Sequence, residues 1–192
     1  MNKIKYIVIL LSVAFFSYGD GHKAHSHELS CYECWELSFG LGKGKIVEEH
    51  GTEKHTVRGD LWHLHGTKGL SRELLGIPIG YGIGLEGFLD SDIDHYKLHA
   101  GIVFFLSEDF HFSIGPALGY AKHGEEEHEE GEEEEEEEEE HSDDWETEFG
   151  YHAELCGHLG HWNDYTIGIF VGYGESDADV CSEYGLSIGR HF

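Results

Sequence analysis

The chain has 192 residues and carries a formal net charge of −27, with 12 basic side chains against 39 acidic ones. This excess of negative charge excludes nucleic acid and anionic membrane surfaces as expected partners, because both repel a polyanion. With 27 glycines, 2 prolines and 13% aromatic residues, and without a sustained helical period, the chain favours a single all-β domain.

Residues 1–19 have the organisation of a secretory signal peptide. Two lysines precede an apolar run at 6–16, and Ser17 and Gly19 are the small residues expected beside a cleavage site. The run is shorter than the ~20 residues that span a bilayer as a helix. We therefore predict an exported protein whose mature chain starts with a histidine-rich segment, 20–33, followed by one domain at 34–192.

Eight segments of this domain alternate between apolar residues and small or ionisable residues, which is the period of a β-strand. They are residues 34–44, 54–65, 77–89, 95–106, 110–122, 148–159, 165–174 and 183–192. Each segment reaches the ~9–11 residues of a transmembrane strand. One face is aliphatic and aromatic, and the other is dominated by glycine, serine and ionisable residues, as expected for a narrow barrel interior.

The chain ends with an alternating stretch, 184–192, whose final residue is the aromatic Phe192. This ending resembles the C-terminal assembly signal of bacterial outer-membrane β-barrels. Together with the signal peptide and the eight segments, it makes the domain similar to the small OmpA/OmpX-like barrel superfamily, although no motif specific to one family lies within it. The resemblance implies an all-β, eight-stranded antiparallel up-and-down transmembrane β-barrel in the outer membrane of a Gram-negative bacterium. Such a barrel is expected to be a monomer in contact with outer-membrane lipid and lipopolysaccharide.

In this topology the connections alternate between the two sides of the membrane. Short turns at 107–109 and 160–164, and a longer one at 67–76, fall on the periplasmic side. The longest connection, 123–147, is extracellular. Eight strands leave an interior that side chains fill, which excludes a general diffusion channel.

The extracellular connection 123–147 is predicted to be a disordered acidic loop, because its nine consecutive glutamates at 132–140 repel one another. Carboxylates suit Ca²⁺ or Mg²⁺, and the flanking histidines suit Zn²⁺, Ni²⁺ or Cu²⁺. Neither an EF-hand spacing nor an HExxH motif occurs, so the expected binding is weak, multiple and exchangeable. With the histidines of the segment 20–33, the candidate ligands are His123, Glu127, His128, Glu140, His141, His22, His25 and His27. The alternative is a solvated, repulsive surface segment that binds nothing.

The predicted inner faces also carry histidines. His152, Glu154 and His158 share one face of the segment 148–159. His111 is expected beside His158, because the two neighbouring strands meet at the periplasmic end. These four residues are candidate ligands of a buried metal site. The alternative, which the sequence alone favours, is a polar network that fills the narrow interior with paired groups.

Four cysteines in an exported chain predict two disulfides. Cys34 and Cys156 share the inward face, so a bridge between them is one option. Cys181 has no obvious partner, and Cys31 forms a Cys-x-x-Cys motif with Cys34. The spacing leaves the connectivity open.

No His-x-Ser-Asn motif occurs, and the Gly-x-Ser-x-Gly spacing at 185–189 lies within a predicted strand rather than at a strand-to-helix elbow, so neither catalysis nor an organic cofactor is expected. The leading interpretation is a non-catalytic outer-membrane barrel whose Glu/His-rich surface loop weakly binds divalent cations, Zn²⁺, Ni²⁺, Cu²⁺ or Ca²⁺, for metal capture or homeostasis. The alternatives are a structural or adhesive surface barrel without a metal role, and a soluble periplasmic β-sandwich.

Overall fold

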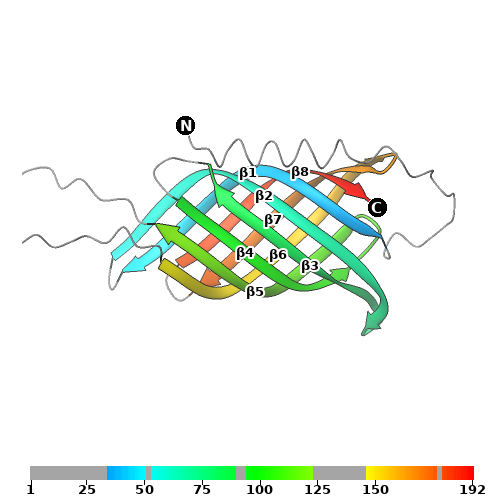
Figure 1. The fold of residues 1–192 in the computed structure, drawn as a ribbon, viewed down its shortest axis with the longest axis horizontal. Helices are drawn as coiled ribbons and strands as arrows, with labels where there is room; N and C mark the ends of the chain where they lie inside the picture. Colours follow the sequence, from blue (N-terminus) through cyan, green and yellow to red (C-terminus); the bar gives the residue numbers. More distant parts are fainter. Residues whose placement is uncertain (1–33, 51–52, 90–93, 123–145, 177–178) are drawn as a thin grey trace, which may run out of the picture.

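The computed structural model describes residues 34–50, 53–89, 94–122, 146–176 and 179–192. Their regular elements are β1 (Trp35–His50), β2 (Glu53–Leu74), β3 (Ile77–Phe88), β4 (Asp94–Phe105), β5 (Phe110–Lys122), β6 (Glu146–Trp162), β7 (Tyr165–Ser176) and β8 (Asp179–His191). Each strand runs antiparallel to its neighbour in the chain (Figure 1). None of the described residues forms a helix long and apolar enough to cross a membrane.

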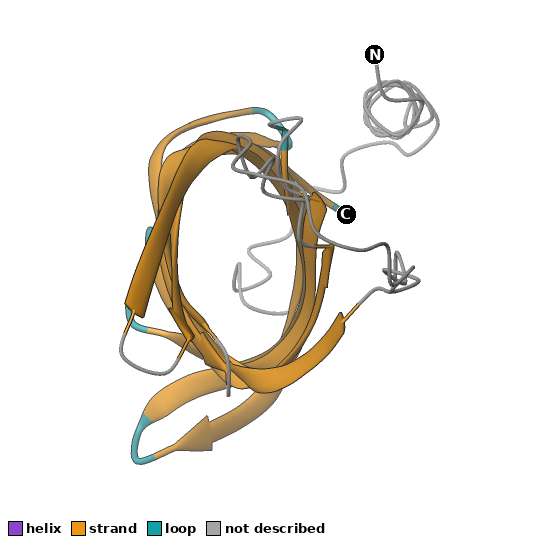
Figure 2. Cartoon of the chain, turned by 90° about the vertical axis from the view of Figure 1, so that its left-hand side faces the viewer, coloured by secondary structure: helices purple, strands orange, loops and turns teal. Residues whose placement is uncertain are grey.

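The sheet closes into a ring because β1 also pairs with β8, from Glu36 opposite His191 to Glu48 opposite Asp179 (Figure 2). A closed ring leaves no edge strand whose peptide groups would lack partners in lipid. The predicted eight-stranded up-and-down barrel is therefore confirmed, and the soluble β-sandwich is excluded.

The outer surface of the ring is apolar on every strand. Exposed side chains include Leu41, Leu70, Ile83, Ile102, Ile114, Leu155, Val171 and Leu186, which come from β1 to β8 in turn. In water such a continuous belt would be a surface for aggregation, whereas in a bilayer it faces acyl chains. A closed antiparallel barrel with this exterior is the outer-membrane type, which confirms the predicted location.

The inner surface alternates with the outer one, as the sequence predicts. It is mostly polar, and its fully or nearly fully buried members include Glu36, His63, His65, Glu86, Lys97, His99, His111, His152, Glu154 and Glu183. Two small apolar clusters interrupt this polar interior: Ile46 with Phe88 and Cys181, and Leu61 with Cys156 and Phe170.

The strand β2 is longer than predicted. Residues 67–76 are expected to form a turn, but β2 continues to Leu74, and the turn consists of Leu75 and Gly76 with φ values of 57° and 78°. Two positive φ angles make the tight turn whose twist matches that of the flanking strands. The register also shifts between Gly69 and Glu73, and the β2–β3 hairpin extends past the other strands (Figures 1 and 2). Such a shift breaks the period-two pattern and hides the continuation of the strand.

Several predicted segments lie outside the described residues: the signal peptide 1–19, the segment 20–33 and residues 123–145 of the acidic loop. The last two residues of the predicted loop, 146–147, belong to β6, which begins at Glu146.

Candidate metal centre in the barrel interior

Glu154 lies at the centre of a histidine cluster inside the barrel. It comes from β6, and its side chain is fully buried. The nearest imidazole nitrogens are His65 Nδ1, 3.0 Å from Glu154 Oε1, and His63 Nε2, 3.1 Å from Oε2. His152 Nε2 lies 3.9 Å from the same Oε2. Because β2 and β6 are not paired in the sheet, these contacts span the interior rather than follow the sheet.

His99 of β4 joins the cluster through ring contacts. Its ring centroid lies 4.1 Å from that of His152, 5.6 Å from that of His65 and 5.8 Å from that of His63. The Phe170 ring packs against the His63 ring, with 4.9 Å between the two ring centroids. Three strands therefore direct four histidines towards one carboxylate, in a volume from which solvent is excluded.

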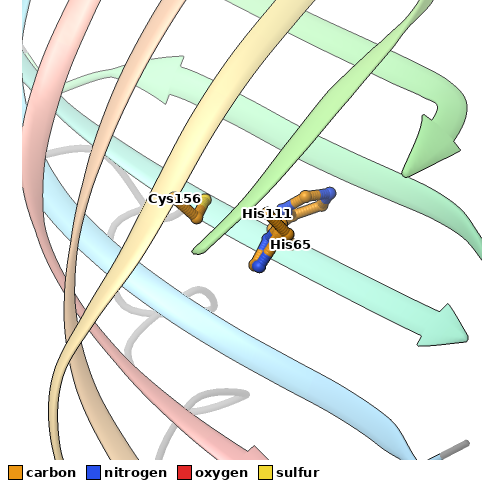
Figure 3. Close-up of side chains that lie close together, drawn as sticks. All are labelled: His65, His111 and Cys156. Carbon is orange, nitrogen blue, oxygen red and sulfur yellow. The ribbon is translucent and has the colours of Figure 1, made fainter. Parts of the chain in front are cut away.

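A second group of ligand atoms shares His65 with this cluster and is drawn in Figure 3. His65, His111 and Cys156 come from β2, β5 and β6, and one ligand atom from each lies within 4.8 Å of the others. The Cys156 thiol donates a hydrogen bond of 2.7 Å to Glu154 Oε1. Imidazole, thiol and carboxylate are the side chains that bind zinc and its neighbours in the periodic table.

Many of these nitrogen atoms have no hydrogen-bond partner within the described part of the chain. They are the Nε2 atoms of His63, His65, His99 and His111 and both ring nitrogens of His152. The distance between His63 and Glu154 is short, but the two groups are not aligned for a hydrogen bond. A network that only filled the interior would satisfy its members, because an unpaired buried polar group costs about 1–3 kcal/mol. The geometry is therefore compatible with a set of metal ligands as well as with a polar network that fills the interior.

Towards the outer end of the barrel, the interior contains a buried lysine side chain, Lys97. Lys97 Nζ lies 2.6 Å from Glu86 Oε1, and both side chains are buried. Glu183 lies beside this pair, with its Oε1 atom 3.5 Å from His152 Nε2. The Lys97 ammonium thus neutralises carboxylates at the outer border of the histidine cluster.

The predicted interior ligands have different positions. His111, His152 and Glu154 lie in or beside the cluster, whereas His158 lies nearer the end that carries the β6–β7 turn, with its Nε2 atom 3.1 Å from Glu36 Oε1. The expected proximity of His111 and His158 is confirmed by a ring distance of 5.8 Å. The remaining predicted ligands lie outside the described residues: His22, His25, His27, His123, Glu127, His128, Glu140 and His141.

The sequence places His63 and His65 at the end of the second predicted strand, level with His111 and His158, but neither they nor His99 are among the predicted ligands. A usable signal was present, because His63 and His65 are two residues apart and must share one face of a strand. The alternation of side chains does not predict that Glu154 of β6 faces these two histidines across the ring, because β2 and β6 are not neighbours in the strand order.

A glycine makes room for His99. A Cβ built on Gly84 would overlap the His99 imidazole, whereas one built on Gly66 would meet its nearest neighbour at an ordinary 3.6 Å. We expect Gly84→Ala to lower the free energy of unfolding by about 1–3 kcal/mol, because the His99 ring is packed against the rings of His63, His65 and His152 and would have to shift against them. Urea unfolding of the refolded barrel measures this, with Gly66→Ala as the matched control. An equal loss in both variants would contradict the close fit.

The predicted disulfides are not formed by the cysteines that the structure describes. Cys34, Cys156 and Cys181 are all free thiols. The predicted option of a disulfide between Cys34 and Cys156 is therefore wrong. The stagger of the strands explains the separation. Cys156 is paired with Phe170 of β7, Phe170 with Gly185 of β8, and Gly185 with Gly42 of β1. Cys156 is therefore level with Gly42, whereas Cys34 lies just before the start of β1. Cys181 packs instead with Ile46 in the outer half.

These thiols should differ in their reactivity. In the folded Cys31→Ser variant, we expect a maleimide to label Cys34, which is half-buried, but not Cys156 or Cys181, which are buried. After unfolding in denaturant without reductant, all three should react. A folded protein whose intact mass is lower by the hydrogens lost to a disulfide would refute the free thiols.

Comparison with known proteins identifies the fold. No protein-family model and no curated protein matches the chain. Among solved structures, the chain is similar to Neisserial surface protein A, with 10% identity, 82% of this chain and 97% of that one covered, and a TM-score of 0.50. It is also similar to Ail, the attachment invasion locus protein of Yersinia pestis, with 20% identity, 83% and 99% covered, and a TM-score of 0.46. The N-terminal β-barrel domain of Pseudomonas aeruginosa OprF matches with 8% identity, 83% and 98% covered, and a TM-score of 0.46. With 10% identity and a TM-score of 0.50, the likeness to Neisserial surface protein A supports the fold of a small outer-membrane barrel and says nothing about a ligand.

Proposed function

We propose that this protein is a non-catalytic outer-membrane β-barrel that binds divalent transition-metal ions in its interior, for metal capture or homeostasis. The observation that carries the proposal is the set of buried imidazole nitrogens around Glu154 that have no hydrogen-bond partner in the described chain. A bound cation would satisfy several of these lone pairs at once and would offset the burial of the carboxylate.

The donor atoms determine which ions fit. Zn²⁺ binds imidazole at about 2.0–2.1 Å in a tetrahedron, so its ligand atoms are about 3.3 Å apart. One ligand atom from each of His63, His65 and Glu154 already lies within 4.8 Å of the others, and a small contraction would close the site. Ca²⁺ prefers six to eight oxygen ligands, which this cluster does not offer. The interior therefore favours Zn²⁺, Ni²⁺ or Cu²⁺ over Ca²⁺.

A catalytic role has little support. The Cys156 thiol is buried and is engaged with Glu154. The cavities beside the cluster measure about 20 Å³ at the periplasmic end and about 10 Å³ at the outer end. Pockets for organic substrates have volumes of about 300–1,000 Å³. One pocket of that size, about 530 Å³, is lined mainly by apolar side chains such as Leu37, Ile83 and Leu98, the last two of which belong to the exposed outer surface. The polar interior itself therefore fits an ion better than an organic substrate.

The same proposal covers the rest of the protein. Because both edges of every strand find a partner within the ring, the barrel completes its sheet alone, which supports a monomer in contact with lipid and lipopolysaccharide. Weak, exchangeable cation binding by the acidic loop and by the histidines of segment 20–33 stays a prediction of the sequence, since both lie outside the described residues.

The test is calorimetry on the refolded mature protein and on a variant that lacks residues 125–140. We expect saturable Zn²⁺ binding with a dissociation constant in the micromolar range or below, retained after the deletion. Weak Ca²⁺ binding should disappear with the loop. If neither protein binds Zn²⁺, Ni²⁺ or Cu²⁺ saturably, the metal role is refuted and the structural or adhesive barrel takes its place.

A further inference from the structure

We infer that the barrel has a second, shallower cation site at its periplasmic mouth, formed by Glu36, His111 and His158, through which ions reach the interior cluster. The mouth site rests on its own geometry, and the transfer rests on the proposed function. Ions would then exchange with the periplasm rather than with the outside of the cell.

The three ligands of the mouth site come from β1, β5 and β6. One ligand atom from each lies within 4.8 Å of the others. Glu36 Oε1 is 3.1 Å from His158 Nε2 and accepts a 3.1 Å hydrogen bond from the Thr166 hydroxyl, which fixes the carboxylate. His111 is buried, and its Nε2 atom has no hydrogen-bond partner among the described residues. This unpaired nitrogen is the independent indication of a ligand.

The mouth site is accessible from the periplasmic end, where the C-terminus and the β4–β5 and β6–β7 turns lie (Figure 1). A cavity there is lined by Cys34, Glu36, His111, His158 and His191 together with the β4–β5 turn. Nearer the surface, the ring centroid of the partly exposed His161 lies 5.3 Å from that of His158. The Nε2 atom of His161 lies 3.3 Å from Asp109 Oδ1. Imidazoles therefore follow one another from the surface inwards, each within reach of the next.

His111 connects the two sites. Its ligand atoms lie within 4.8 Å of Glu36 and His158 on one side, and of His65 and Cys156 on the other. The His111 ring is 6.1 Å from that of His65. A cation can thus exchange one ligand at a time, with His111 bound throughout the transfer.

The outer half of the interior is unfavourable for the entry of a cation. Ile46, Phe88 and Cys181 form an apolar cluster there. The buried Lys97 ammonium, held by Glu86, lies between the outer end and the histidine cluster. Because the Lys97 charge is already compensated by Glu86, the feature that opposes entry of a cation here is the apolar cluster, in which Ile46 and Phe88 offer no ligand atoms. The structure thus favours access from the periplasmic side.

The experiment measures Zn²⁺ stoichiometry and exchange in the full mature protein, refolded in lipid nanodiscs. Calorimetry counts the bound ions, and a fluorescent chelator reports the release rate. Two variants remove the mouth site, Glu36→Gln and His158→Asn. The matched control is His95→Asn, which removes a histidine from the outer end, where His95 lies 3.4 Å from Asp179.

We expect both mouth variants to bind one Zn²⁺ fewer in the barrel and to release the remaining interior ion more slowly than the unchanged protein, because the ligands along the exit route are missing. The His95 variant should behave like the unchanged protein. Full stoichiometry and unchanged rates in both mouth variants, or slowing in the His95 variant alone, would overturn the inference while leaving the interior site intact. Absence of interior Zn²⁺ in the unchanged protein would instead refute the proposed function itself.

Discussion

Replacement of Lys97 by methionine is expected to lower the free energy of unfolding of the barrel by about 3–5 kcal/mol. The Lys97 ammonium lies 2.6 Å from Glu86 Oε1, and the two side chains are only 6% and 5% exposed. Methionine keeps most of the volume but leaves the buried carboxylate without its counter-charge. Urea titration in lipid vesicles, followed by tryptophan fluorescence and by heat-dependent gel mobility, measures the change.

Two further variants show whether burial of the charge causes this effect. Lys43 pairs with Asp60 on the outside of the barrel, where the side chains are 62% and 58% exposed, so Lys43→Met should cost less than about 1 kcal/mol. The double variant Lys97→Met/Glu86→Gln should recover part of the loss, because the uncompensated charge is then removed. Equal losses for Lys97→Met and Lys43→Met would show that the interior is well hydrated, contrary to the structure.

The sequence predicted the fold well because a transmembrane barrel repeats one physical requirement along the whole chain. Every strand must expose apolar side chains to lipid and keep small or ionisable ones inside, so the period-two pattern carries the strand number and the facing of the residues. It failed at β2, where the register shift and the Leu75–Gly76 turn lengthen the strand without extending the alternation.

The interior site was only partly predictable. Pattern and strand order place neighbours such as His111 and His158 together, and this prediction is confirmed. The contact between His65 and Glu154 depends on how far side chains reach across the ring, which no local pattern encodes. The alternative of a paired polar network stays open, because the structure contains both paired interior groups, such as Lys97 with Glu86, and buried nitrogens without an aligned partner among the described residues.

The interior cluster yields the second large expected effect. We expect Glu154→Gln to weaken Zn²⁺ binding in the barrel by about 100-fold or more, since loss of a supporting group alone typically costs 10–100-fold. The amide keeps the shape of the side chain but removes the negative charge that faces His63 and His65. Calorimetry on the variant lacking residues 125–140 measures this without the acidic loop.

Stability provides a second measurement of the same binding. At a free Zn²⁺ concentration about 100 times the dissociation constant, the unchanged barrel should gain about 2.7 kcal/mol of unfolding free energy, because the ion binds only the folded state. Glu154→Gln should gain little at that concentration. Glu148→Gln is the control, since Glu148 lies at the outer end, where it accepts a hydrogen bond from Ser176, and should keep the full gain. If both variants lose the gain equally, Zn²⁺ responds to the overall negative charge of the barrel, and Glu154 is not its ligand.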